Sequence, residues 1–223
     1  MTIGVLAVQG AFIEHEHMLE NLGIPCIEIR KKEDLSNIDG IILPGGESTV
    51  QGQLLDKLDM KETLRTMISD GLPVLATCAG LILLAEHIGK KEASHLGTMP
   101  VTVRRNAYGR QLSSFMTTAA IKEIGDYPMV FIRAPYITEI AENAFSDSFS
   151  APDHADDTVA SNKDTIVPME GVKILSEIDG HIVAAQYQNQ IGLAFHPEMT
   201  DDTRIHQYFI NLVNSYLSKT KSA

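Results

Sequence analysis

Short apolar runs alternate with amphipathic segments through the first half of the chain. The apolar runs are Ile3–Val8, Ile24–Ile29, Gly40–Leu43 and Pro73–Ala76. The segments between them that have helical spacing are Ala11–Leu22, Val50–Leu58 and Met60–Ser69. Buried strands that alternate with helices in this way are typical of parallel sheets covered on both faces. We therefore predict an α/β fold with a doubly wound, mostly parallel sheet and flanking helices.

Beyond about residue 97 the pattern becomes rich in strands. The predicted strands are Met99–Val103, Met129–Arg133, Val172–Ile178, Ile182–Gln188 and Ile191–Phe195. Gly180 and Asn189 mark the turns between the last three, and an amphipathic helix is expected over Thr203–Leu217. We expect a single domain over residues 1–223, because a chain of this length suffices for one large core.

The segment Phe145–Glu170 fits neither pattern. It holds six acidic side chains and one lysine among repeated Ser and Ala residues. Low hydrophobicity with net negative charge is typical of a mobile surface loop. We expect an acidic insertion at about residues 145–170 that is dispensable for chemistry.

Composition limits the possible partners and location. The formal charge of −11 argues against nucleic acid as the main partner. No apolar run approaches the length needed to cross a bilayer, and no basic leader segment precedes the first strand. The two cysteines, Cys26 and Cys78, suit a reducing compartment, and Cys26, among apolar residues, is interpreted as structural. We expect a cytoplasmic protein without a membrane partner.

Cys78 lies at a tight turn between a predicted strand and a predicted helix. Its neighbours Thr77, Ala79 and Gly80 are small, as such a turn requires. The turn lifts the middle side chain above the sheet edge, where the helix N-terminus favours a thiolate. A nucleophile is one interpretation. A buried cysteine that acts as a small apolar side chain is the other.

His196-Pro197-Glu198 follows the last predicted strand. Pro197 favours extended backbone at His196, and residues two apart in an extended chain face the same way. The Glu198 carboxylate can then orient the imidazole as a base for a thiol nucleophile. The alternative is a surface turn with a solvated Glu198.

Two glycine-containing segments also fall at predicted strand ends. Gly45 and Gly46 would let backbone N–H groups approach a developing oxyanion. The same stretch could be only a turn and a helix cap by Ser48 or Thr49, and neither interpretation excludes the other. Gln9-Gly10 ends the first strand, at the same edge of the sheet.

The sequence does not indicate a metal or a nucleotide cofactor. His15 and His17 lie two apart on a predicted helix, so they point to different faces. Neither a pair of closely spaced cysteines nor an H-E-x-x-H run occurs, and G-x-G-x-x-G and P-loop runs are also missing.

The chain resembles the class I (triad) glutamine amidotransferases, and among them the glutaminase subunits of pyridoxal 5'-phosphate synthase. The resemblance rests on motifs at Gly4–Phe12, Pro44–Thr49, Thr77–Gly80, Arg105–Gln111, Ile132–Pro135 and His196–Glu198. It implies a flavodoxin-like fold, hydrolysis of L-glutamine to glutamate and ammonia, and delivery of the ammonia to a synthase subunit in a hetero-oligomer.

The resemblance also assigns roles to individual residues. The catalytic residues would be Cys78, His196 and Glu198. The glutamine site would comprise Gly46, Glu47, Ser48, Arg105, Ile132 and Arg133. The oxyanion site and its activation would involve Gln9, Gly10, Gly45, Gly46 and Ala79. Three alternatives stay open: a glutaminase for another synthase such as imidazole glycerol phosphate synthase, a non-catalytic regulatory module, and surface charges at Arg105 and Arg133.

Overall fold

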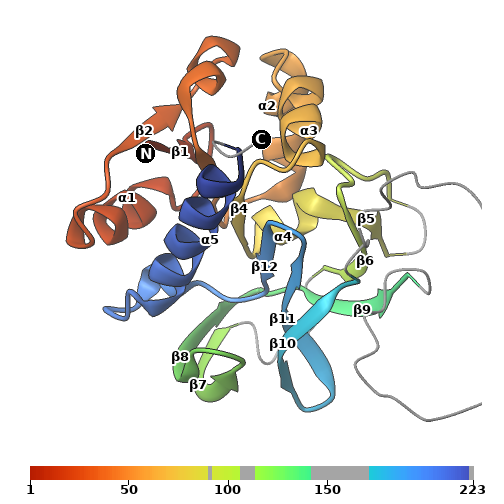
Figure 1. Cartoon of the computed structure of the whole chain (residues 1–223). Coiled ribbons are helices and arrows are strands. Elements are labelled where there is room, and N and C mark those ends of the chain that lie inside the picture. The colour runs from red at the N-terminus through yellow and green to blue at the C-terminus, as the bar shows by residue number, and fades with distance from the viewer. Residues whose placement is uncertain (90–91, 106–113, 142–170, 221–223) are drawn as a thin grey trace, which may run out of the picture.

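A computed structural model describes residues 1–89, 92–105, 114–141 and 171–220. Its centre is a 10-stranded sheet (Figure 1). Nine of the strands follow the spatial order β2-β1-β3-β4-β12-β11-β9-β6-β5, and the tenth, β10, pairs with β11. The strands of the first five positions are β2 (Cys26–Ile29), β1 (Ile3–Leu6), β3 (Gly40–Leu43), β4 (Val74–Thr77) and β12 (Gln190–Leu193). These five pair in parallel, so their carboxyl ends share one edge.

Helices cover both faces of this parallel part (Figure 1). On one face lie α1 (Phe12–Asn21) and α5 (Arg204–Thr220). The other face carries α2 (Ser48–Lys57), α3 (Lys61–Ser69) and the short α4 (Ala79–Leu84). A 3₁₀ turn, η1 (Lys32–Asn37), joins β2 to β3. The strands Ile3–Leu6, Gly40–Leu43 and Val74–Thr77 are buried at every position, as strands covered on both faces must be.

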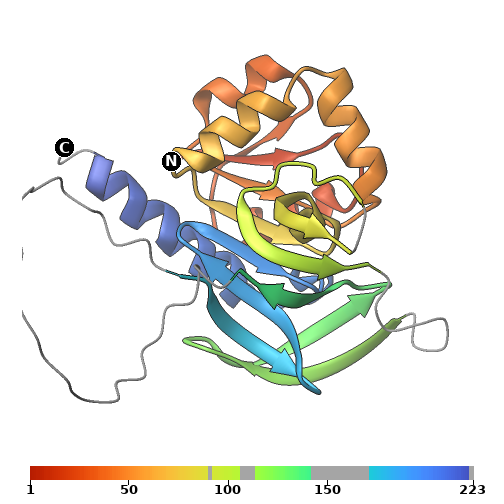
Figure 2. The same ribbon diagram turned by 90° about the vertical axis from the view of Figure 1, so that its right-hand side faces the viewer.

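The rest of the sheet is largely antiparallel. It contains β11 (His181–Tyr187), β10 (Lys173–Ile178), β9 (Tyr136–Ile140), β6 (Met99–Arg104) and β5 (Ala85–Ile88). A separate hairpin of β7 (Ser114–Ile121) and β8 (Gly125–Ile132) lies beneath it (Figure 2). The backbone N–H of His196 donates to the carbonyl of Val130 in β8 at 2.9 Å, so the hairpin supports the segment after β12.

The structure confirms the predicted fold class, with some differences in the elements. The strand Gly40–Leu43 has its predicted bounds. Three strands were not predicted: β5, β7 and β9. The apolar run after Cys78 was expected to continue as a helix, but α4 ends at Leu84 and the chain enters β5 directly. The predicted insertion Phe145–Glu170 lies outside the described residues.

Within the described part of the chain, no helix combines the length and the apolar character needed to cross a bilayer.

Candidate active site

Cys78 occupies a strained turn between β4 and α4. Its backbone has φ 48° and ψ −100°, a region that residues with a side chain rarely adopt. The backbone N–H of Cys78 donates to the carbonyl of Leu193 in β12 at 2.8 Å, which continues the pairing of β4 with β12. A Cβ at Gly80 would overlap the carbonyl oxygen of Leu43, so only glycine lets α4 approach β3 this closely. The predicted turn is therefore present, and backbone strain of this kind is typical of functional sites.

His196 lies just beyond the end of β12, the strand that pairs with β4. Its Nδ1 is 2.7 Å from Oε1 of Glu198, and the two side chains are 7% and 0% exposed. The predicted pairing is thus present, but its local geometry differs from the prediction. Pro197–Met199 form a 3₁₀ turn, η3, rather than a continuation of the strand. The turn, not the alternation of an extended chain, brings the carboxylate to the imidazole.

The charge state of this pair follows from its surroundings. Burial lowers the pKa of His196, but hydrogen bonds with Cys78 and Glu198 outweigh that effect and raise the pKa to about 10. Burial raises the pKa of Glu198, but His15 and the hydrogen bond with His196 lower it below its usual value. At neutral pH the imidazole therefore holds two protons beside an ionised carboxylate.

Gly45 lies against the side chains of both Cys78 and His196. A Cβ at this position would overlap the imidazole of His196 and come within 3.4 Å of the Cβ of Cys78. The Gly45 carbonyl accepts a hydrogen bond from the N–H of Ala11 at 3.0 Å. A Cβ at Gly10, whose φ is +108°, would overlap that same carbonyl. The glycines predicted at the two strand ends thus form one packed unit beside Cys78.

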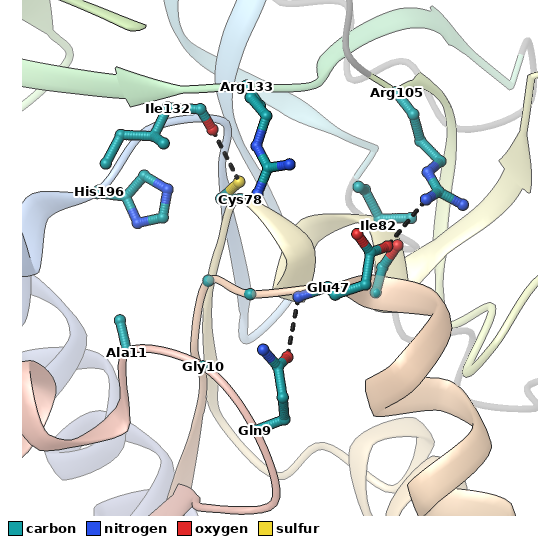
Figure 3. A pocket seen from close by; sticks show the side chains of 13 residues that line it. Gln9, Gly10, Ala11, Glu47, Cys78, Ile82, Arg105, Ile132, Arg133 and His196 are labelled. Atoms are coloured by element: carbon teal, nitrogen blue, oxygen red, sulfur yellow. Dashed lines mark hydrogen bonds and ion pairs between the residues drawn. The ribbon is translucent and has the colours of Figure 1, made fainter. Parts of the chain in front are cut away.

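Gln51, which was not among the predicted site residues, holds this unit together by hydrogen bonds. Its Nε2 donates to the carbonyl of Gln9 at 2.9 Å and to that of Pro44 at 3.1 Å. The side-chain Oε1 of Gln9 in turn accepts from the N–H of Glu47 at 2.9 Å (Figure 3). Gln51 is fully buried within α2, where a polar residue on a buried helix face was the available signal.

Ser48 differs from the cap that the sequence allowed. It is the first residue of α2 rather than its cap, and the cap residue Glu47 makes no side-chain capping bond. Among the described residues the Ser48 hydroxyl is buried without a hydrogen-bond partner. Thr49 also does not cap the helix, because its hydroxyl accepts from Arg105 at 3.1 Å. The Ser48 hydroxyl is therefore free to meet a ligand.

A cavity of about 270 Å³ opens above Cys78 (Figure 3). Its lining comprises Gln9, Gly10, Ala11, Gly45, Gly46, Glu47, Ser48, Cys78, Ile82, Arg105, Ile132, Arg133 and His196. Of these, Ala11 and Ile82 were not predicted. Two predicted residues stand behind the cavity wall: Ala79 is buried at the start of α4, and Glu198 lies beyond His196. The thiol of Cys78 donates towards the carbonyl of Ile132, at 3.8 Å.

Two arginines line the cavity, and their surroundings differ. Arg105 is paired with Glu47 at 3.0 Å and with Glu92 at 2.9 Å. The residues after it in the predicted motif, 106–111, lie outside the described part. Arg133, at φ +45°, directs its guanidinium into the space beside Cys78 (Figure 3). Cationic and anionic side chains thus surround one small polar cavity.

The described residues contain no group of three or more His, Cys, Asp or Glu side chains placed to hold a metal ion.

Comparison with known families shows which family the chain belongs to. The sequence model of the SNO glutamine amidotransferase family matches residues 5–169 and 160–215. The chain belongs to this glutamine amidotransferase family.

Relatives of this glutamine amidotransferase cover almost its whole length. A protein of Desulfitobacterium hafniense named pyridoxal 5'-phosphate synthase subunit PdxT is 50% identical over 215 residues, which are 96% of this chain and 94% of the relative. The PdxT of Methanocorpusculum labreanum is 49% identical over 214 residues, 96% of this chain and 98% of the relative. A crystal structure of a glutamine amidotransferase superposes with a TM-score of 0.79 at 34% identity and covers 95% of this chain and 98% of the other.

The geometry of this glutamine amidotransferase also argues against two alternatives left open above, an apolar role for Cys78 and a surface turn at His196–Glu198. Cys78 is buried, but its sulfur lines the cavity rather than the core, which a purely apolar role would not require. The His-Pro-Glu run is no solvated surface turn, because the Glu198 side chain is fully buried against His196. Both observations match a nucleophile with an oriented base.

Proposed function

We propose that this chain is the glutaminase subunit of a pyridoxal 5'-phosphate synthase, hydrolysing L-glutamine to L-glutamate and ammonia. The observation that carries the proposal is the Cys78 thiol beside the buried His196–Glu198 pair at a cavity of small-molecule size. The names of the relatives at 50% and 49% identity support the choice of synthase.

The reaction begins with the proton of the Cys78 thiol already on His196, so that a thiolate lies beside a doubly protonated imidazole. The thiolate attacks the side-chain amide carbon of glutamine, and the carbonyl oxygen becomes an oxyanion. As the tetrahedral intermediate collapses, the imidazolium of His196 donates a proton to the leaving nitrogen, and ammonia departs from a thioester. Water, deprotonated by His196, then attacks the thioester carbon. The carbon–sulfur bond breaks, glutamate is released, and the Cys78 thiolate and the doubly protonated His196 are restored.

Glutamine is held by the polar cavity wall. Its α-carboxylate meets Arg133 and the donors of Arg105 that Glu47 and Glu92 leave unused, because a guanidinium carries five N–H groups. Its α-ammonium meets Glu47 and the carbonyl of Ile132. Ser48 contributes its unpaired buried hydroxyl. The two backbone glycines, Gly45 and Gly46, together with Gln9 and the N–H of Ala79, are proposed for the oxyanion site and its activation.

The oxyanion site is proposed to be incomplete in the isolated chain. The Gly45 carbonyl accepts from Ala11, and the Gln9 carbonyl accepts from Gln51, so both peptides are held in their present orientation. Rotation of the Gln9-Gly10 peptide must break the bond to Gln51, and Gly10 is the residue that tolerates the new angles. Docking of the synthase subunit on this strand-end face would supply the energy, and one oriented donor changes kcat by roughly 10²–10³.

The partner follows from the product. Ammonia released without an acceptor wastes glutamine, so the chain acts in a hetero-oligomer with the synthase (lyase) subunit, which consumes the ammonia. Nucleic acid and membrane are not proposed as partners, and we propose that the chain acts in the cytoplasm. Imidazole glycerol phosphate synthase as the acceptor has no counterpart in the names of the relatives described above.

The proposal is tested by mixing the chain with the pyridoxal 5'-phosphate synthase lyase subunit and measuring glutamate release from glutamine. Release by the wild-type chain and loss in Cys78→Ala are expected. The proposal is overturned if the wild-type mixture releases no glutamate, or if Cys78→Ala releases it at the wild-type rate. A mixture with the synthase subunit of the imidazole glycerol phosphate enzyme is the matched control, and no stimulation is expected there.

A further inference from the structure

A row of buried polar side chains continues behind the triad, away from the cavity. Glu198 contacts His196 through Oε1, and its other oxygen, Oε2, lies 3.4 Å from Nε2 of His15. His15 belongs to α1 and is fully buried. Its Nδ1 is 2.9 Å from Nε2 of His206, a buried residue of α5. A buried imidazole that faces the triad carboxylate needs an explanation beyond packing, because apolar side chains fill this space at lower cost.

We propose that His15 is a positioning residue of the triad, donating its Nε2–H to Oε2 of Glu198 and holding that carboxylate against His196. This inference rests on the glutaminase function proposed above.

The ring protons of the two histidines decide the direction of the hydrogen bonds. Burial lowers the pKa of His15 and that of His206, so each ring is neutral and carries one proton. The pair shares one hydrogen bond, between Nδ1 of His15 and Nε2 of His206. Only one of these two nitrogens carries the proton, which leaves two arrangements.

In the first arrangement His206 donates from Nε2 to a bare Nδ1 of His15. His15 then carries its proton on Nε2, towards Glu198 and towards the hydroxyl of Thr77 at 3.2 Å. The Nδ1 of His206, which has no partner among the described residues, is a bare acceptor.

In the second arrangement His15 donates from Nδ1 to His206. The Nδ1–H of His206 becomes a buried donor without an acceptor in the described part of the chain. The lone pair of His15 Nε2 can accept from Thr77, but it also faces the ionised oxygen of Glu198. Buried donors without acceptors are rarer than unfilled acceptors, and two facing lone pairs repel. The first arrangement is therefore the stable one.

The charged surroundings agree with a neutral donor at His15. Glu198 raises the pKa of His15, whereas His196 lowers it, and Glu14 on the same helix raises it. Burial is the largest effect and keeps the ring neutral. A neutral N–H that donates to the Glu198 anion stabilises it without adding a second positive charge beside the imidazolium of His196.

Loss of the Nε2–H of His15 would act first on Glu198. Oε2 of Glu198 has no hydrogen-bond partner within the described residues, so without the Nε2–H of His15 at 3.4 Å it would be left unpaired in the core. The carboxylate would then take up a proton more readily, or rotate away from His196. Both changes weaken the general acid, while the cavity that binds glutamine stays intact because His15 does not line it.

The direct test is NMR of the full chain with ¹⁵N-labelled histidine, which reads the protonated nitrogen of each ring. We expect both His15 and His206 to carry the proton on Nε2. A proton on Nδ1 of His15 overturns the proposal, whatever the glutaminase assay shows.

The kinetic test compares His15→Leu with His15→Gln, with the synthase lyase subunit present. His15→Leu removes the donor, and kcat for glutamine should fall roughly 10- to 100-fold, the value of a hydrogen bond to a charged group, with KM unchanged. The acid limb of kcat/KM should move to higher pH, because the Glu198 carboxylate takes up a proton more easily without the donor. His15→Gln can place an amide N–H near the position of Nε2 and should recover most of kcat and the wild-type limb.

Leu19→Ala is the matched control. Leu19 is buried one turn along the same helix, and its apolar side chain has no hydrogen bond to offer the triad. This variant should lower thermal stability without moving the acid limb. If His15→Leu scales activity equally at every pH, as Leu19→Ala does, His15 is merely structural and the proposal fails. If the wild-type chain with its partner releases no glutamate, the proposed function fails instead, and the NMR result still decides the tautomer.

Discussion

At the scale of single residues, the site centres on Cys78, whose strained backbone conformation is maintained by its neighbours. Cys78 keeps φ at 48° because Gly80 packs on Leu43 and Leu193 accepts from its N–H. His196 is held from two sides, by the Val130 carbonyl at its backbone and by Glu198 at its ring. Cys78 and His196 are therefore both positioned by contacts outside the cavity, which leaves their cavity side open for the glutamine of the proposed function.

The pH dependence of the reaction tests the role of Glu198. The pKa of His196 is raised to about 10, so its protonated form persists through neutral pH and is lost as pH rises through that value. The alkaline limb of kcat/KM in the wild type should therefore lie near that pH. Glu198→Gln removes one cause of the raised pKa, and the limb should move to lower pH. A limb at the same pH in Glu198→Gln would mean that the carboxylate does not act on His196.

The two arginines of the cavity should affect binding rather than chemistry. The α-carboxylate of glutamine is unchanged during hydrolysis, so its contacts act equally on ground and transition states. Arg133→Ala and Arg105→Ala should raise KM by about tenfold or more with kcat little changed, as expected for a charged hydrogen bond of about 1.5–3 kcal/mol. Arg65→Ala, on the exposed face of α3, is the control. A fall in kcat at constant KM in both cavity variants contradicts the assignment.

At the scale of elements, strand ends were the predictable part. The strands that carry Gln9, Gly45 and Cys78 are short apolar runs closed by small residues, a local signal. Parallel pairing then dictates that these ends meet. The unpredicted strands lack such signals: β5 follows α4 without a turn residue, and the helix before it is buried all round. Periodicity cannot separate a strand from a helix when every position is apolar or buried.

The close approach of α4 and β3 gives a prediction at this scale. Gly80→Ala places a Cβ on the Leu43 carbonyl and should destabilise the chain by about 1–3 kcal/mol, the usual cost of overpacking. Gly23→Ala is the comparison: nothing lies within 4 Å of its added Cβ, so any loss there reports only the backbone strain at φ +68°. Thermal denaturation is the measurement, and a Gly80→Ala variant as stable as the wild type would show that α4 does not need the glycine contact.

At the scale of the whole molecule, the site joins segments far apart in the chain. His15 and His206 touch across 191 positions, and Cys78 touches Ile132 across 54. The sequence could place His15 on a helix face but could not show that α5 closes over it. Gln51 was missed for the same reason, since its partners come from the first strand end and its own loop.

Activation by the partner belongs to this scale. The hydrogen bonds of Gly45 with Ala11 and of Gln9 with Gln51 hold the two glycine-containing segments proposed for the oxyanion site in their present orientation. We expect the isolated chain to be a poor glutaminase, with kcat raised roughly 10²–10³ by saturating synthase subunit if one oxyanion donor is completed. Glutamate release measured with and without that subunit is the test. Equal rates in the two cases would show that the oxyanion site is already complete in the isolated chain.

Following the amide nitrogen of glutamine is the most direct test of the proposed glutaminase function. Glutamine labelled with ¹⁵N at the amide is supplied to the chain and the synthase lyase subunit together with a pentose phosphate and a triose phosphate. Labelled pyridoxal 5'-phosphate is predicted for the wild type, and none for Cys78→Ala, which should form labelled product again only when ¹⁵N-ammonium is added. Labelled product from Cys78→Ala and glutamine, or no label from the wild type, would contradict it.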